Sequence, residues 1–262
     1  MAEAARIGFA GDREIAVQIL DLLLGEGVRP EVLLVSAEEQ ASHSHELIAR
    51  CEHLTPDHVM RGVDFRAPAG IETLASADLD LMVGIHFPYL VPPELLDVPS
   101  VGWLNLHPAY LPWNRGWHTA SWALLEDTPL GATLHFMDEG IDTGDIVYQR
   151  RLEVGPGDTA DALYPRLQQL EYEVFREAWP DIRANTYQRT VQAPGTGSQH
   201  TAKDLFAAGL QEIDQAQQVA AGELLQKLRA LTTNRTDEAA YFESGGKRYR
   251  VRIEVTEEDA ES

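Results

Sequence analysis

The sequence has a single cysteine, few basic residues and no long hydrophobic run. With Cys51 alone, the chain cannot form an intramolecular disulfide, which fits a reducing compartment. No apolar stretch approaches the roughly 20 residues that a bilayer-spanning helix needs. The first residues also lack the basic-then-apolar order of a secretory signal. These absences predict a cytoplasmic protein that has no membrane partner.

Lysine and arginine are scarce, with 21 of them against 42 acidic residues and a formal net charge of −21. Nucleic-acid binding depends on cations at phosphates, so a tRNA-sized partner is disfavoured. A small nucleotide is compatible with this charge, because two or three well-placed cations can hold a pyrophosphate. The G-x-G-x-x-G fingerprint is also absent, which argues against a nicotinamide enzyme.

The first two thirds of the chain alternate short apolar runs with amphipathic stretches. We expect strands at 6–10, 32–35, 79–85, 101–106, 131–137 and 145–154, and helices at 13–26, 38–51 and 159–179. Such alternation predicts an α/β, doubly wound, Rossmann-like and mostly parallel sheet. The predicted catalytic domain covers residues 1–182.

The composition becomes polar after residue 182, and 183–202 is interpreted as a linker or an active-site loop. Short helices are expected near 203–209 and 221–230. A β-hairpin is expected where 239–243 and 248–255 flank Ser244-Gly245-Gly246-Lys247. Residues 183–262 therefore predict a small α+β appendage, too small for an independent core, that packs on the catalytic domain or on a second subunit.

Two motifs concentrate the residues that can carry chemistry. Asn105-Leu106-His107 ends an expected strand, and a doubly wound sheet binds its ligands at such ends. Residues 105 and 107 point to the same side of a strand, so a carboxamide and an imidazole share one edge. The second motif runs from Gly131 to Asp145 and joins two expected strands through a loop with four acidic residues and two glycines.

These motifs resemble the folate-dependent formyltransferase family, whose signature is an Asn-x-His pair followed by a distant aspartate. Asn105, His107 and Asp142 occupy the three catalytic positions, and the resemblance covers roughly residues 5–180. It implies a Rossmann-like enzyme that takes a formyl group from N10-formyltetrahydrofolate and passes it to an amine. No His-Cys cluster lies near the acidic loop, so we expect no metal.

A finer resemblance is to the N-formyltransferases of dTDP-4-amino-4,6-dideoxyhexoses. It rests on the segments 11–14, 86–89, 111–117, 230–234 and 238–242. It implies a nucleotide-linked amino sugar as substrate, a place in lipopolysaccharide O-antigen sugar synthesis, and a homodimer. The implied folate contacts are His86, Phe87, Pro88, Tyr89, Met137, Asp138 and Gly140. The implied substrate contacts are Gly11, Asp12, Arg13, Trp113, Asn114, Arg115, Trp117 and Asn234.

The chemistry asks for these three catalytic residue types. When an amine attacks the formyl carbon, an oxyanion develops, and the Asn105 amide can bind it without titrating. His107 can stabilise the oxyanion when protonated or relay the proton of the amine when neutral. Asp142 can fix the tautomer of His107 and accept a proton through an ordered water. The division of general-base work between His107 and Asp142 stays open, because the two titrations can be coupled.

Plainer interpretations exist for several of these residues. An isolated Asn-x-His pair is more often a turn or capping pair, and its joint occurrence with Asp142 is what favours catalysis. Trp113 and Trp117 fit either core packing or a wall against a sugar or base. Arg13 fits either an anion site or a simple surface turn, and His135 is interpreted as structural.

Three rival functions follow from the same sequence. Methionyl-tRNA formyltransferase has the same fold, but it should carry a larger RNA-binding barrel and a basic surface. Hydrolysis of formyl-folate should require an N-terminal regulatory domain, which we expect to be absent because the first strand begins near Arg6. A non-catalytic folate-binding or regulatory protein would not need the set of Asn105, His107 and Asp142. The sequence fixes neither the sugar, nor the carbon that bears its amine, nor the base.

Overall fold

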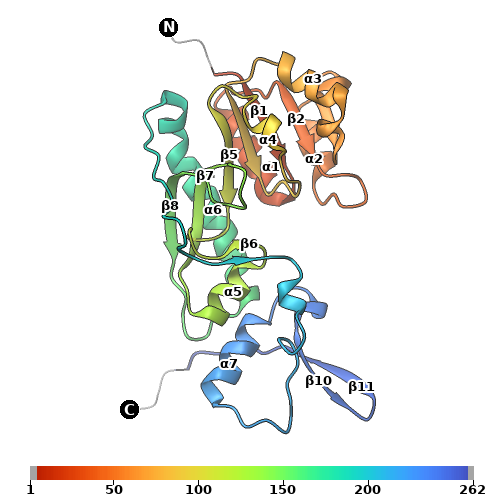
Figure 1. Ribbon diagram of the computed structural model, residues 1–262, viewed down its shortest axis with the longest axis vertical. Coiled ribbons are helices and arrows are strands. Elements are labelled where there is room, and N and C mark those ends of the chain that lie inside the picture. Colours follow the sequence, from red (N-terminus) through yellow and green to blue (C-terminus); the bar gives the residue numbers. More distant parts are fainter. Residues whose placement is uncertain (1–4, 259–262) are drawn as a thin grey trace. The chain divides into compact units, whose positions relative to one another are not determined.

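The computed structural model describes residues 5–258 and contains a seven-stranded sheet in the order β3-β2-β1-β4-β5-β7-β8 (Figure 1). Strands β1 to β5 pair in parallel, and β7 runs antiparallel to β5. The mostly parallel α/β sheet predicted from the sequence is therefore confirmed. The strands are β1 (Ile7–Gly11), β2 (Val32–Val35), β3 (Val59–Arg61), β4 (Leu81–Ile85), β5 (Gly102–His107), β7 (Leu130–Phe136) and β8 (Ile146–Leu152).

The central strands are continuous buried runs rather than alternating ones. Every residue of β1, β2 and β4 is buried, as in parallel sheets that are covered on both faces. The helices of the chain are α1 (Arg13–Gly25), α2 (Ser44–Arg50), α3 (Pro68–Ser76), α4 (Pro93–Leu96), α5 (Thr119–Glu126), α6 (Ala160–Ala184) and α7 (Ala221–Ala230). Single 3-10 turns are η1 (Pro56–His58), η2 (Asp64–Arg66), η3 (Asp204–Phe206) and η4 (Thr236–Glu238). Among the described residues, no helix is both long and apolar enough to cross a membrane.

Several predicted boundaries differ from the structure. Strand β3 and helix α3 were not predicted, because a three-residue strand and a nine-residue helix give little periodic signal. The helix predicted from residue 38 begins only at Ser44, since hydrogen bonds to Asp12 hold the backbone of residues 42 and 43. Helix α6 continues beyond its predicted end to Ala184, and Asn185 then takes a left-handed conformation with φ 53°.

The chain forms two compact units, each with its own core. The first comprises Met1–His107, Thr133–Gln149 and Glu171–Gln192, and the second comprises Pro108–Ala132, Arg150–Leu170 and Ala193–Ser262. The first unit contains an apolar cluster whose largest fully buried side chains are Phe65 and Trp103. The second unit has one apolar cluster around Leu163 and Leu167, and another around Leu205 and Leu231.

The second unit also holds two small sheets. Strand β6 (Arg115–Gly116) pairs in parallel with β9 (Gln199–His200). Strands β10 (Ala240–Ser244) and β11 (Lys247–Val251) pair antiparallel across Gly245 and Gly246, both at positive φ. The predicted C-terminal helix and hairpin are therefore present as α7 and β10–β11.

The topology of the sheet marks one edge of the first unit as a place for ligands. The chain runs outward through β1, β2 and β3, then returns to the other side of β1 with β4. Parallel sheets bind ligands at such a switch point, beyond the carboxyl ends of the strands. Gly11 pairs with Ile85, and Ile85 pairs with Leu106, so β1, β4 and β5 end at the same level.

Candidate active site

Strand register brings the first pair of predicted residues to this edge. Asn105 and His107 lie two residues apart on β5, so their side chains share a face of the sheet. Across the antiparallel pair, Asn105 faces His135 and His107 faces Thr133 on β7. His107 is buried, and Asn105 is half-buried.

Asp142 lies in the loop between β7 and β8, and the fold of this loop is fixed in several ways. The Gln192 Nε2 donates hydrogen bonds to the carbonyl oxygens of Asp142 (2.9 Å) and Gly144 (2.8 Å). A side chain at position 144 would put its Cβ 2.0 Å from the Phe136 carbonyl oxygen, so the close turn requires glycine. Asp142 itself has φ 53°, a conformation that is uncommon for a residue with a side chain.

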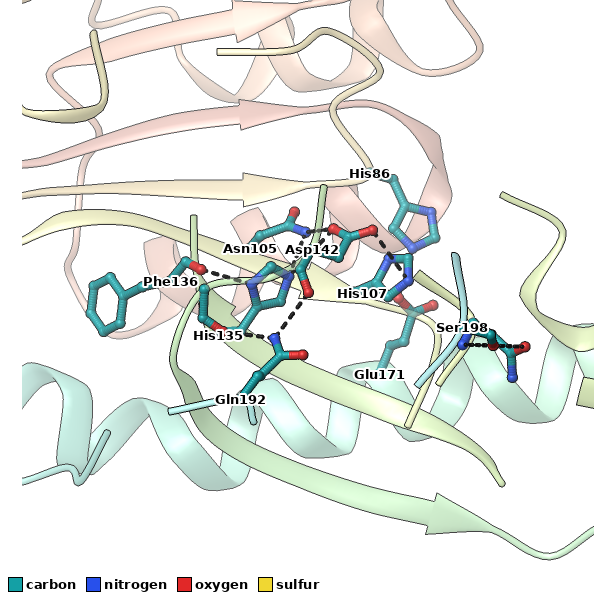
Figure 2. Close-up of polar contacts among 11 residues, drawn as sticks. His86, Asn105, His107, His135, Phe136, Asp142, Glu171, Gln192 and Ser198 are labelled. Carbon is teal, nitrogen blue, oxygen red and sulfur yellow. Dashed lines mark hydrogen bonds and ion pairs between the residues drawn. The ribbon is translucent and has the colours of Figure 1, made fainter. Parts of the chain in front are cut away.

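The three predicted catalytic side chains meet in the first unit, and Asp142 is the centre of the group (Figure 2). Its Oδ2 lies 3.5 Å from the His107 Nε2, and its Oδ1 lies 3.4 Å from the Asn105 Nδ2. The His135 Nε2 lies 3.5 Å from the same Oδ1. The distances from Asp142 to His107 and to Asn105 exceed the usual 2.7–3.2 Å of a strong hydrogen bond, and such contacts commonly tighten only when substrate binds.

His135 orients the carboxamide of Asn105. Its Nδ1 lies 2.7 Å from the Phe136 carbonyl oxygen, which can only accept, so Nδ1 carries the proton. In the neutral ring, Nε2 is then an acceptor, and the Asn105 Nδ2 lies 3.1 Å from it. The sequence interpretation of His135 as merely structural missed this contact, because only the register of β5 against β7 reveals it.

The end of β1 carries the predicted substrate residues Gly11, Asp12 and Arg13. A Cβ at Gly11 would lie 2.8 Å from the Ala16 Cβ, so glycine allows close packing against α1. The buried Asp12 Oδ1 accepts hydrogen bonds from the Ser42 backbone (3.1 Å), the Ser42 hydroxyl (3.0 Å) and the His43 backbone (3.2 Å). Burial raises the pKa of Asp12, but hydrogen bonds, including one from the Arg13 backbone, outweigh it and lower the pKa.

Asp12 therefore anchors the 42–43 loop, and its contact with substrate stays a prediction. Arg13 is exposed and has φ 73°. Non-glycine residues in this region of conformational space cluster at functional sites.

The end of β4 carries an ion pair that the sequence did not reveal. The His86 Nε2 lies 2.6 Å from the Oε1 of Glu171, a residue of α6 whose side chain is only 1% exposed. The His86 side chain is 15% exposed. Burial lowers the pKa of His86, but the negative charge and the hydrogen bond of Glu171 outweigh it, so the pKa is raised.

The remaining predicted folate contacts lie around the same strand ends. Phe87 and Tyr89 pack against the Phe65 core, with ring centroids 5.5 and 6.5 Å from that of Phe65. Met137 packs against the same cluster. In the acidic loop, Asp138 Oδ1 accepts from the Gly140 backbone at 3.0 Å, which keeps the loop compact. Pro88, between the half-buried Phe87 and Tyr89, is exposed.

The other predicted substrate residues belong to the second unit. Asn114 is only 1% exposed; its Nδ2 donates to the Thr128 hydroxyl (2.9 Å), and its Oδ1 accepts from the Ser198 hydroxyl (3.3 Å). The Arg115 guanidinium donates to the Thr196 carbonyl oxygen (3.2 Å). By contrast, large exposed surfaces remain on the residues Trp113, Trp117 and Asn234.

Comparisons with known proteins agree with this geometry. The formyl transferase family model matches residues 18–179, which contain Asn105, His107 and Asp142. The chain belongs to the formyl transferase family. A second model, the N-formyltransferase dimerization C-terminal domain, matches residues 204–257. The formyltransferase predicted from the sequence is thus confirmed at the level of the family.

Relatives of this formyl transferase are named for two kinds of acceptor. A dTDP-4-amino-4,6-dideoxyglucose formyltransferase of Mycobacterium bovis is 30% identical over 174 residues, 66% of this chain and 72% of that protein. A methionyl-tRNA formyltransferase of Geobacter sulfurreducens is 30% identical over 177 residues, 66% of this chain but only 56% of that protein. A solved 4-N formyltransferase of Francisella tularensis superposes with a TM-score of 0.80 at 26% identity, covering 97% of this chain and 98% of that one.

Among residues 5–258, no group of three or more His, Cys, Asp or Glu side chains is arranged to hold a metal ion. The side chains around Asp142 combine an amide, two imidazoles and a carboxylate. Such a combination suits a flat heterocycle with a polar edge, which is the chemistry of a pterin.

Proposed function

We propose that this chain transfers the formyl group of N10-formyltetrahydrofolate to the amino group of a nucleotide-linked amino-deoxy sugar, with dTDP as the nucleotide. The observation that carries the proposal is the convergence of Asn105, His107 and Asp142 at one sheet edge, with 3.4–3.5 Å between Asp142 and the other two. The match to a formyl transferase model and the 30% identity to a dTDP-amino-sugar enzyme support it.

In this proposal the amine forms a bond to the formyl carbon, and the formyl oxygen gains negative charge. Asn105 binds that oxyanion through an Nδ2 hydrogen. One hydrogen of this amide is directed to His135 at 3.1 Å, and the other faces Asp142 at a longer 3.4 Å. The longer contact is the weaker one, so it is the one that the oxyanion replaces.

Proton transfer falls to His107 and Asp142 together. The attacking amine must lose a proton, and the folate nitrogen must gain one as the carbon–nitrogen bond to folate breaks. The His107 Nε2 and the Asp142 Oδ2, 3.5 Å apart, form a pair that can take the first proton and return the second.

The acceptor is proposed to be a sugar rather than a tRNA. The net charge of −21 opposes a long polyanion, and the matched C-terminal model is that of an N-formyltransferase dimerization domain. The same model supports a homodimer in which residues 183–262 form the appendage that meets the second subunit. We further propose that the enzyme acts in the cytoplasm, in the synthesis of lipopolysaccharide O-antigen sugars, as the resemblance of its sequence motifs to the amino-sugar enzymes implies. Methionyl-tRNA remains the second candidate acceptor, because one relative at equal identity uses it.

Calorimetric binding tests this choice directly. The wild-type protein is titrated with dTDP, UDP and tRNA, each with and without 5-formyltetrahydrofolate. We expect selective dTDP binding and separate binding of the folate. Binding of tRNA with no response to either nucleotide would overturn the sugar acceptor and leave the folate site standing.

A further inference from the structure

His86 and Arg13 lie at adjacent strand ends on either side of the switch point of the sheet. Arg13 follows β1 and His86 follows β4, and these two strands pair in parallel with Gly11 opposite Ile85. The Asp12 backbone N–H also donates to the Ile85 carbonyl oxygen at 3.2 Å. Both residues adopt left-handed backbone conformations, with φ 73° and 51°. Two strained residues at the switch point indicate a functional edge.

One ring nitrogen of His86 is already bound within the protein. Its Nε2 is bound to Glu171 at 2.6 Å, and the other oxygen of that buried carboxylate has no hydrogen-bond partner among the described residues. His86 is therefore the group that compensates the buried charge of Glu171. The Nδ1 of the same ring makes no hydrogen bond within the described part of the chain, and the side chain keeps 15% of its surface exposed.

Arg13 adds a second positive charge close by. Its guanidinium is exposed and makes no hydrogen bond or ion pair with another described residue. It is near enough to oppose the charging of His86, while Glu171 and Asp12 favour that charging. Asp12 is already committed to the 42–43 loop through Ser42 and His43. Two positive charges at adjacent strand ends, on His86 and Arg13, repel each other unless an anion lies between them.

We propose that His86, held by Glu171, and Arg13 form a binding site for the diphosphate group of the nucleotide substrate. This proposal rests on the proposed function and deepens it, because it assigns the anionic part of the substrate to particular side chains. The His86 Nδ1–H and the Arg13 guanidinium donate charge-assisted hydrogen bonds to phosphate oxygens. In a chain with a net charge of −21, such a local pair of cations is what lets an anionic substrate bind.

The test compares His86→Gln, Arg13→Gln and Glu171→Gln with wild type by calorimetry, using dTDP, thymidine, inorganic pyrophosphate and 5-formyltetrahydrofolate. Glutamine at 86 keeps a donor for Glu171 and removes the charge. We expect His86→Gln and Arg13→Gln each to weaken dTDP and pyrophosphate binding about tenfold and to leave thymidine binding unchanged. His53→Gln is the matched control, because the His53 Nε2 contacts the Pro30 carbonyl oxygen, which precedes β2 at the amino ends of the strands.

The dependence on pH separates charge from packing. Glu171 keeps His86 charged above its ordinary pKa, so Glu171→Gln should weaken dTDP binding more at pH 8.5 than at pH 6. An equal loss at both pH values would mean that the pair only packs the loop, and it would overturn the role of the charge. If Glu171→Gln does not fold, the affinities of His86→Gln and Arg13→Gln for dTDP and pyrophosphate still test the diphosphate site.

The remaining outcomes separate this proposal from the proposed function. Unchanged dTDP affinity in both His86→Gln and Arg13→Gln, with dTDP binding intact in wild type, would overturn the diphosphate site alone. Losses confined to 5-formyltetrahydrofolate would assign the two cations to the glutamate carboxylates of folate and likewise overturn it. Pyrophosphate binding that depends on His86, in a protein that binds no dTDP, would support the anion site and contradict the nucleotide-sugar function.

Discussion

Two asparagines of the predicted site, Asn105 as a catalytic residue and Asn114 as a substrate contact, have opposite environments in the structure. Asn105 is half-buried, and its Nδ2 lies near ionisable groups, His135 at 3.1 Å and Asp142 at 3.4 Å. Asn114 is 1% exposed, and its amide is bonded to the hydroxyls of Thr128 and Ser198. Asn105 keeps a weakly engaged donor beside groups that can move protons, whereas Asn114 joins two segments of the second unit. Asn114 therefore has a clear part in the fold, and its contact with substrate stays a prediction.

The largest effect expected from this contrast is on turnover. Replacing Asn105 with alanine removes the proposed oxyanion donor, so kcat should fall by about 10²–10³ while folate affinity is largely kept. Steady-state rates with N10-formyltetrahydrofolate and a dTDP-amino sugar measure the loss, and calorimetry measures the folate affinity. A variant with a near-normal rate would show that Asn105 is not the oxyanion donor.

Asn114→Ala should act on stability instead. The substitution removes the two hydrogen bonds between the buried Asn114 amide and the half-buried Thr128 and Ser198 hydroxyls. Because each such bond contributes about 0.5–1.5 kcal/mol, the free energy of unfolding should fall by about 1–3 kcal/mol. Urea titration followed by fluorescence measures this loss, and Asn105→Ala is the matched control with a smaller one. A stable Asn114→Ala protein with a large defect in substrate affinity would reverse the contrast and make Asn114 a ligand contact.

His135→Ala is expected to have a smaller effect on rate than Asn105→Ala. Without the His135 Nε2, the Asn105 amide loses its orienting acceptor, and partners of this kind typically contribute about tenfold or more. We expect kcat to fall about tenfold with little change in KM. His135→Gln, which retains an acceptor oxygen, should recover part of the rate. Equal rates in wild type and His135→Ala would return His135 to a purely structural role.

The smallest expected effect is the pH dependence of stability at the His86–Glu171 pair. The folded-state pKa of His86 is raised, so charging of His86 stabilises the fold fully below its unfolded pKa of about 6.5. That contribution is lost as pH rises through the folded pKa. The difference in unfolding free energy between wild type and His86→Gln should therefore be larger at pH 6 than at pH 9. A difference that grows with pH would contradict a charged His86.

The sequence predicted most of the sheet and the three central side chains of the site. Continuous apolar runs such as 32–35 identify buried parallel strands without any knowledge of their partners. Asn105, His107 and Asp142 could be named because their spacing matches a known signature. Their proximity also follows from a general rule, since the ends of strands in a doubly wound sheet meet at one edge.

What the sequence could not supply depends on register and packing. His135 joins the site only because β7 pairs with β5 so that residue 135 faces Asn105. Glu171 meets His86 only because α6 covers the end of β4, yet a signal was present in the sequence. Position 171 lies four residues after Leu167 on the apolar stripe of the helix, where a buried carboxylate requires a partner.

One turnover experiment tests the central claim most directly. The wild-type protein is incubated with N10-formyltetrahydrofolate and either a dTDP-4-amino-4,6-dideoxyhexose or methionyl-tRNA, and the products are identified by mass spectrometry, with Asn105→Ala as the control. The account predicts a formamido sugar nucleotide from the wild type, almost none from Asn105→Ala, and no formylated tRNA. Formylated methionyl-tRNA with an unmodified sugar nucleotide would contradict it.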